Sequence, residues 1–179
     1  MDMSDQRTIA APREVVLAAL NDPEVLKASI PGCEEIEKHS DTEMAAKVTL
    51  KIGPVKASFK GQVTLSDIDP PNGYTITGEG SGGAAGHAKG SAAVRLEEDG
   101  ENTILHYDVK AQVGGKIAQL GGRLIDSTAK KLAGQFFDNF SSIVAPPSED
   151  EAKEEAADGK KKGWFGKMFG KKDEAGTQS

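Results

Sequence analysis

Residues 116–144 read KIAQLGGRLIDSTAKKLAGQFFDNFSSIV, and this stretch decides the fold. Apolar residues recur every three or four positions from Ile117 to Val144, which is the spacing of one face of an α-helix. A helix with an apolar face of this length has to lie along a hydrophobic partner. Pro146 and Pro147 end it, because proline cannot continue the hydrogen-bonded ladder of a helix.

Gly121 and Gly122 are the weak point of this predicted helix. Each glycine costs about 1 kcal/mol relative to alanine in a helix interior. Two interpretations stay open. The pair marks either close backbone packing or a break between a short helix and a long one, or else it forms a hinge that opens a cavity.

Alternation with a period of two residues replaces the helical period from about Cys33 onward. Apolar or small residues alternate there with charged or hydroxyl-bearing ones, as in an antiparallel sheet with one buried and one solvated face. Turns rich in proline and glycine separate the runs. The runs cover residues 43–52, 54–66, 74–80, 86–97 and 103–113. The sequence therefore predicts a meander of about six consecutive strands, and the helix at 116–144 is the only element long enough to cover its buried face.

The segment before this meander is predicted to hold one strand and two short helices. Residues 3–10 are short and mixed, which favours an edge strand. A helix is expected to begin at about Pro12, because proline is favoured in the first turn of a helix. A second helix should run from Pro23 to Ala28, with Asp22 as its N-terminal cap. The fold class is then α+β, with a curved antiparallel sheet wrapped around a long C-terminal helix.

Small residues dominate part of the buried face of the predicted sheet. They are Gly61, Gly78, Gly80, Gly86, Ala88, Gly90 and Ala92. Glycines in strands can bend a sheet or let a helix pack closely against it. Alternatively, they leave room between sheet and helix for an apolar ligand. The sequence alone leaves both interpretations open.

The lining of such a cavity would come from the inner face of the strands and the apolar face of the helix. We expect it to comprise Val48, Leu50, Phe59, Gly61, Val63, Ile76, Gly78, Tyr107, Leu120, Leu124, Thr128, Leu132 and Phe136. Tyr107, Ser127 and Thr128 carry hydroxyls that can each donate one hydrogen bond to a carbonyl or hydroxyl of a ligand. No convergent polar cluster marks a catalytic centre in the predicted cavity.

Composition excludes several classes of protein. Hydrophobic residues make up 37% of the 179 residues and concentrate in residues 1–147, which is enough for a modest core. The net charge of −6 gives no overall attraction to nucleic acid. The single cysteine, Cys33, excludes an internal disulfide and is either a packed turn residue or a reactive thiol. Without a signal-like or membrane-spanning apolar run, the sequence predicts a cytoplasmic protein.

The composition changes after Pro147. Residues 148–158 hold six acidic residues and one lysine, which predicts a solvated, disordered linker. Residues 159–172 then hold six lysines and no acidic residue, together with four large apolar side chains. We therefore treat residues 159–179 as a separate basic and aromatic tail.

Lysines beside large apolar side chains are typical of a segment that binds the surface of an anionic membrane. The residues predicted to do so are Lys160, Lys161, Lys162, Trp164, Phe165, Lys167, Met168, Phe169, Lys171 and Lys172. Three other roles stay open for the tail: a soluble basic extension, a nucleic-acid contact and a docking peptide for a protein partner.

The predicted order of elements looks like the helix-grip fold of the START/Bet v 1-like (SRPBCC) superfamily, over residues 1–147. Three motifs within it resemble the CoxG family of proteins associated with carbon monoxide dehydrogenase. The motifs are Ile30-Pro31-Gly32-Cys33, then Gly53-Pro54-Val55 followed by Phe59-Lys60-Gly61, and Gly115-Lys116-Ile117-Ala118-Gln119-Leu120-Gly121.

This resemblance implies a function and a location. The family is encoded beside molybdenum-containing dehydrogenases in aerobic carbon monoxide oxidisers. It implies a role in bringing the dehydrogenase to the cytoplasmic face of the cell membrane, or in coupling it to respiratory quinone. Relatives in the superfamily bind lipids, sterols, polyketides or isoprenoids between sheet and helix, which implies a bound menaquinone or ubiquinone and no covalent or metal cofactor.

Three hypotheses follow. The protein is a carrier that presents quinone to the dehydrogenase, a ligand-free adaptor between dehydrogenase and membrane, or an enzyme acting on a hydrophobic substrate. Some relatives are cyclases or dehydratases, but this chain has no matching acid–base pair. The alternation also places His87 and His106 on the solvated face of the sheet, which argues against the enzyme.

Overall fold

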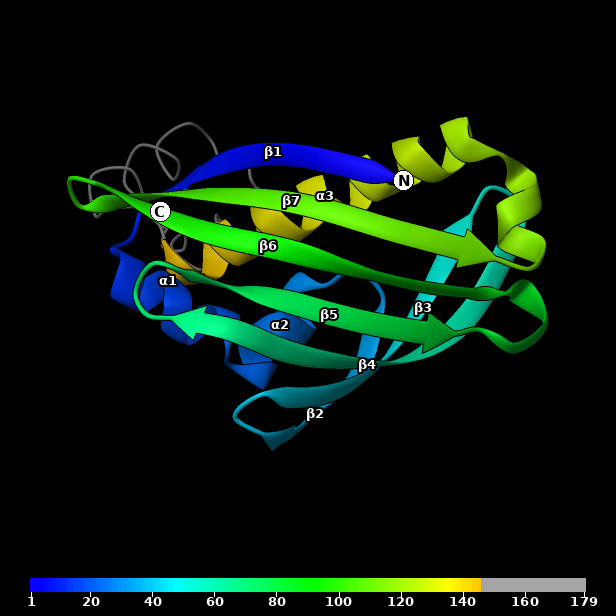
Figure 1. Cartoon of the computed structure of the whole chain (residues 1–179), viewed down its shortest axis with the longest axis horizontal. Helices are drawn as coiled ribbons and strands as arrows, with labels where there is room; N and C mark the ends of the chain where they lie inside the picture. Colours follow the sequence, from blue (N-terminus) through cyan, green and yellow to red (C-terminus); the bar gives the residue numbers. More distant parts are fainter. Residues whose placement is uncertain (146–179) are drawn as a thin grey trace, which may run out of the picture. The chain divides into compact units, whose positions relative to one another are not determined.

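Within residues 1–145, the part of the chain that this computed structural model describes, seven antiparallel strands form one curved sheet in the order β1-β7-β6-β5-β4-β3-β2 (Figure 1). Strands β2 to β7 follow one another in both sequence and space, which confirms the predicted six-strand meander. β1 pairs with β7 and forms one edge, as predicted, and β2 forms the other. The strands are β1 (Asp2–Ile9), β2 (Cys33–Ser40), β3 (Glu43–Ile52), β4 (Val55–Asp69), β5 (Gly73–Ser81), β6 (His87–Asp99) and β7 (Asn102–Gly114).

Two short helices connect β1 to β2. These are α1 (Arg13–Leu20) and α2 (Pro23–Ser29). The predicted cap of α2 is present, since the backbone N–H of Glu24 donates to a side-chain oxygen of Asp22 at 2.9 Å. A single 3-10 turn, η1 (Gly83–Ala85), joins β5 to β6.

The predicted helix at 116–144 is divided in two. A 3-10 turn, η2 (Lys116–Leu120), precedes the α-helix α3 (Gly122–Val144), and Gly121 between them has a φ of +95°. The helical segment at 116–144 is therefore not continuous. The physical reason is that this φ lies in the left-handed region that glycine adopts readily and other residues rarely do. Of the interpretations left open for the glycine pair, the break between a short and a long helix is the one observed.

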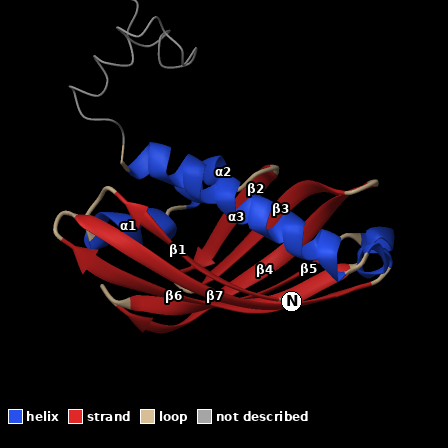
Figure 2. Ribbon diagram, turned by 90° about the horizontal axis from the view of Figure 1, so that it is seen from above, coloured by secondary structure: helices blue, strands red, loops and turns tan. Residues whose placement is uncertain are grey.

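The long helix α3 crosses the inner face of the sheet, as the view from above shows (Figure 2). Its C-terminal half carries Phe137 and Phe140, which belong to the main hydrophobic core with residues of α1 and of strands β4 to β7. Asn139 donates from Nδ2 to the carbonyl oxygen of Ser29 at 3.1 Å, and Arg7 on β1 bonds the carboxylate of Asp138 at 2.7 Å. These contacts fix the second half of α3 to α2 and to the β1 edge.

Every helix within residues 1–145 is too short or too polar to span a bilayer. The predicted linker at residues 148–158 and the predicted membrane-binding tail at 159–179 lie outside the described residues.

Candidate ligand-binding site

An apolar cavity with two compartments lies between the inner face of the sheet and α3. The small compartment has a volume of about 310 Å³ and the large one about 600 Å³. Both fall in the size range of small-molecule binding sites. The compartments adjoin, because five residues line both: Ile30, Ala46, Val63, Ala133 and Phe136.

The small compartment lies at the α1 end, beside the hydrophobic core. Leu20 of α1 and Leu26 of α2 close it from the side of the short helices, and Phe137 closes it from α3. The rest of its lining comes from the strands and the segment after α2: Met3, Ile30, Ile36, Met44, Ala46, Val63, Leu65, Tyr74, Ile76, Ala92, Val94, Leu105, Tyr107 and Val109, with Ala133 and Phe136 of α3.

The large compartment extends toward η2, where Ile117, Ile52 and Val113 line it. Its floor is a patch of small residues in register on neighbouring strands. Gly61 pairs with Gly80, and Gly78 pairs with Gly90. Because these residues present no side chain to the inner face, the space beneath α3 stays open there.

The close approaches around these glycines differ. A Cβ on Gly61 would lie 2.8 Å from the carbonyl oxygen of Glu79, and one on Gly90 would lie 2.4 Å from that of Lys110. A Cβ on Gly80 would meet nothing nearer than 3.5 Å, which is an ordinary contact. Gly61 and Gly90 are thus needed for close strand packing as well, whereas at Gly80 the sheet can accept a side chain.

Most residues predicted to line a cavity do line one of the two compartments. Val48, Leu50, Phe59, Gly61, Val63, Gly78, Leu132 and Phe136 line the large one, and Ile76 and Tyr107 line the small one. Leu120, Leu124 and Thr128 line neither. Leu124 instead lies over the β3–β4 turn, where its Cδ2 is 2.9 Å from the position of a Cβ on Gly53. That these residues contact a ligand stays a prediction.

Two tyrosines are the polar-tipped residues in the lining of the small compartment. Burial raises the pKa of Tyr74 well above its ordinary value. The pKa of Tyr107 is also raised, mainly by burial and further by the nearby charge of Asp5, while Arg7 opposes the shift. The ring of Tyr107 stacks on Phe137 with ring centres 5.2 Å apart.

Tyr107, Ser127 and Thr128 are the hydroxyl donors that the sequence predicts, and this prediction omits Tyr74. Ser127 is exposed, and its Oγ donates to the carbonyl oxygen of Leu124 at 3.0 Å. Tyr74 could have been found, since the alternation of residues 74–80 places it on the buried face. Its phenol is therefore the second hydroxyl that faces the small compartment from a strand.

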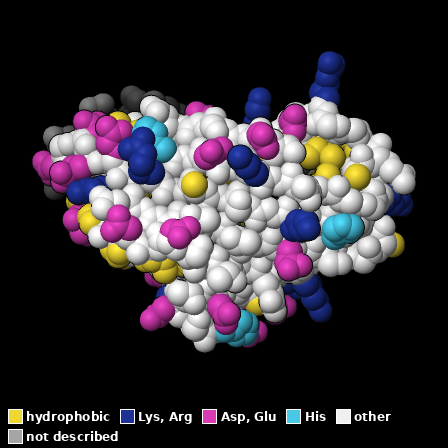
Figure 3. All heavy atoms as spheres, viewed as in Figure 1, with side chains coloured by type: hydrophobic (Ala, Val, Ile, Leu, Met, Phe, Trp, Pro, Cys, Tyr) yellow, Lys and Arg dark blue, Asp and Glu magenta, His cyan; other side chains and the backbone are white. Residues whose placement is uncertain are grey.

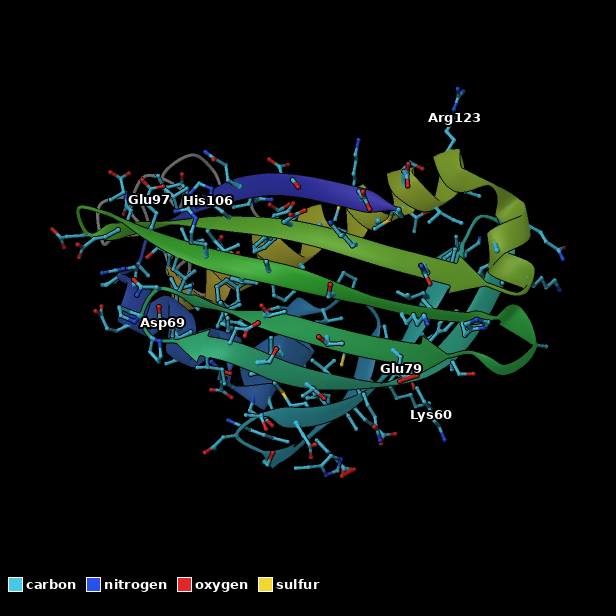
Figure 4. All side chains as sticks on the ribbon, viewed as in Figure 1. Lys60, Asp69, Glu79, Glu97, His106 and Arg123 are labelled. Atoms are coloured by element: carbon cyan, nitrogen blue, oxygen red, sulfur yellow. The ribbon has the colours of Figure 1, made fainter. Side chains whose placement is uncertain are left out.

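His87 and His106 lie on the outer face of the sheet, as the alternation predicts. His87 is exposed, and His106 lies beside Glu97 with Nε2 2.8 Å from Oε1 (Figure 4). The outer face as a whole carries scattered charged side chains of both signs (Figure 3). The tail residues predicted to bind a membrane, Lys160 to Lys172, lie outside the described residues.

A curved antiparallel sheet that grips a long helix, with an apolar cavity between them, defines the START/Bet v 1-like class of proteins. Solved structures of this class resemble the chain in fold. The conserved protein from Geobacillus kaustophilus has a TM-score of 0.76 and 29% identity, covering 81% of this chain and 95% of its own. A START superfamily protein from Mycobacterium smegmatis has a TM-score of 0.60 and 15% identity, covering 80% and 96%.

A third similar structure is the ZhuI aromatase/cyclase from Streptomyces sp. R1128, with a TM-score of 0.57 and 14% identity over 80% of this chain and 93% of its own. At that identity it shows the fold alone. The family model for CoxG, the G component of carbon monoxide dehydrogenase, matches residues 6–145. The chain belongs to this family. A comparison with curated proteins gave no match.

Proposed function

We propose that this protein is a non-enzymatic accessory protein of an aerobic, molybdenum-containing carbon monoxide dehydrogenase, and that it carries a hydrophobic ligand between sheet and α3. The observation behind this proposal is the pair of adjoining apolar compartments, of about 310 and 600 Å³. Membership of the CoxG family supports the dehydrogenase as partner.

The shape and chemistry of the cavity favour a long apolar ligand with few polar atoms. Burial of each methylene group contributes about 0.8 kcal/mol, so an isoprenoid chain would gain most of its binding free energy from the large compartment. Respiratory quinones, menaquinone or ubiquinone, combine such a chain with a ring. They also accept electrons, and a dehydrogenase needs an acceptor for the electrons that its reaction releases.

The lining offers no pair of groups for acid–base catalysis. Glu79 and Lys89 are the charged residues along the large compartment, and both are exposed residues that alternate with inner-face glycines. Their carboxylate and ammonium groups therefore belong to the solvated side of the strands. This supports a binding protein over an enzyme.

The basic and aromatic tail supplies the membrane part of the proposal. Its six lysines and four large apolar side chains suit reversible binding to an anionic bilayer surface, at about 1 kcal/mol for each lysine near that surface. The carrier would collect quinone at the cytoplasmic face of the membrane and present it to the dehydrogenase. A ligand-free adaptor would use the same tail without the cavity.

Native mass spectrometry with organic extraction tests this function. The full chain is purified from a host that makes quinones, and one sample is incubated with quinone-loaded vesicles. We expect a stoichiometric quinone or other isoprenoid in the protein. A protein that stays empty after exposure to loaded vesicles would reject the carrier and favour the adaptor.

A further inference from the structure

The small compartment is lined by a tyrosine whose hydroxyl is not paired with another group of residues 1–145. Tyr74 is only 6% exposed, and its side chain lines the compartment from the start of β5. Within residues 1–145 its hydroxyl forms no hydrogen bond to another protein group. Its oxygen is nevertheless within reach of a small molecule, because Nε of Arg13 is the one fully enclosed side-chain nitrogen or oxygen without a partner in this range.

The other buried hydroxyls in the described part of the chain are satisfied. The Oγ1 of Thr103 donates to the carbonyl oxygen of Ala11 at 2.7 Å, and the Oγ of Ser29 donates to that of Val25 at 2.7 Å. The fold therefore provides partners for buried hydroxyls elsewhere. Tyr74 differs from them in facing a cavity.

Tyr107 is the natural comparison, because it lines the same compartment from β7. Its ring is held against Phe137, and its hydroxyl is close enough to Asp5 and Arg7 on the β1 edge to feel both charges. Tyr107 is less buried than Tyr74, and water at this edge can satisfy it. Tyr74 is the more buried of the two, so a ligand in the compartment would compete with less water for its hydroxyl.

We propose that the hydroxyl of Tyr74 hydrogen-bonds a neutral oxygen on the ring of the ligand, and that the ring enters the small compartment while the apolar chain fills the large one. This inference rests on the proposed function and adds the orientation of the ligand and the residue that selects its ring. An apolar cavity of about 150 Å³ holds benzene. The small compartment, at about 310 Å³, has room for a ring system of two fused rings.

The chemistry of a phenol suits both forms of a quinone. The raised pKa keeps Tyr74 protonated at every physiological pH. The phenol can donate to the carbonyl oxygen of a quinone, and its own oxygen can accept from the hydroxyl of a quinol. Tyr74 therefore recognises the ring in either redox form, and no proton or electron passes through it.

The test measures how two ligands, one with ring oxygens and one without, bind to the wild type and to two variants of the full chain. The ligands are 2-methyl-1,4-naphthoquinone and 2-methylnaphthalene, which share the fused rings and the methyl group. The variants are Tyr74→Phe and, as a control outside the cavity, Thr77→Val on the outer face of the same strand. Each removes one hydroxyl and keeps the shape of the side chain. Dissociation constants come from isothermal titration calorimetry, and melting temperatures of the empty proteins are measured in parallel.

We expect Tyr74→Phe to weaken binding of the naphthoquinone about two- to tenfold, the range for one net neutral hydrogen bond. Binding of 2-methylnaphthalene should be unchanged, and Thr77→Val should leave both dissociation constants as in the wild type, because Thr77 lines neither compartment. The empty Tyr74→Phe protein should melt at the same temperature as the wild type or higher, because the change removes an unpaired buried hydroxyl.

Each contrary result has its own meaning. Equal effects of Tyr74→Phe on both ligands, or no effect on the naphthoquinone, would overturn the inference and leave the carrier function standing. A lowered melting temperature would show that the hydroxyl has a structural partner and would overturn it as well. Failure of the wild type to bind either ligand would overturn this inference, because the small compartment would then not hold the ring. The carrier function is decided separately, by mass spectrometry after exposure to vesicles loaded with the full quinone.

Discussion

The substitution Gly80→Leu should separate a real cavity from a packed interior. Gly80 lies on the inner face of β5 and lines the large compartment. A Cβ at this position would have its nearest neighbour, the carbonyl oxygen of Lys60, at 3.5 Å, so the backbone need not move. The four carbons of the leucine side chain would then project into the large compartment, where the proposed ligand would bind.

The expected loss of affinity follows from the volume that these carbons take. Displacing about four methylene groups of the ligand at about 0.8 kcal/mol each removes about 3 kcal/mol of binding free energy. Since 1.4 kcal/mol is a factor of about ten, the dissociation constant should rise by a little over a hundredfold. The empty protein should keep its stability or gain slightly, because glycine in a strand interior costs about 0.5–1 kcal/mol relative to alanine.

Two quantities are measured for each variant. One is the amount of ligand extracted after incubation with quinone-loaded vesicles, and the other is the free energy of unfolding of the empty protein in urea. Thr77→Leu is the matched control, because Thr77 is exposed on the outer face of the same strand. The control should retain ligand. If Gly80→Leu instead lowered the free energy of unfolding by about 1–3 kcal/mol and left ligand content unchanged, the interior would be solid at this point and the reasoning would be refuted.

Three further changes test other parts of the molecule. Trp164→Ala combined with Phe165→Ala should release the protein from anionic vesicles in a sedimentation assay at an unchanged melting temperature, and unchanged sedimentation would contradict the membrane role of the tail. Phe140→Ala should lower the free energy of unfolding in urea by about 3–5 kcal/mol, because Phe140 is fully buried, while Ile143→Ala on the same helix at 41% exposure should cost much less. Cys33 should react with iodoacetamide at pH 7.5 more slowly than free cysteine, because burial raises the pKa of its thiol and lowers the thiolate fraction, and faster labelling would identify a reactive thiol.

The strands could be predicted well because the alternation that marks a strand lies within a few consecutive residues. The run at residues 43–52 coincides with β3, and that at 103–113 falls within β7. One side chain in two faces the core, so alternation shows both the strand and its buried face. The division of the last helix was harder to predict, because apolar spacing continues across Gly121 and only the backbone conformation ends the helix there.

The site could be predicted only in part, because some of its lining comes from N-terminal segments without a clear period. Met3, Leu20 and Leu26 line the small compartment from three N-terminal elements that the sequence pattern does not bring to the cavity. Leu124 shares the apolar face of α3 with Leu132, but it lies over a turn and lines neither compartment. Which part of a helical face meets a cavity depends on how tertiary contacts place the helix.

Helix α3 is anchored to the rest of the fold mainly through its C-terminal half. The anchored half holds Phe137, Asp138 and Asn139. The other half begins at Gly121, and its Leu124 lies over the β3–β4 turn. About 22 Å of helix separates Phe137 from Gly122 at 1.5 Å per residue. If α3 tilted by about 10° about its anchored half, its first turn would move by about 4 Å. If the proposed ligand binds, a longer isoprenoid chain would need only such a small tilt, and the core that sets the stability of the fold would remain undisturbed.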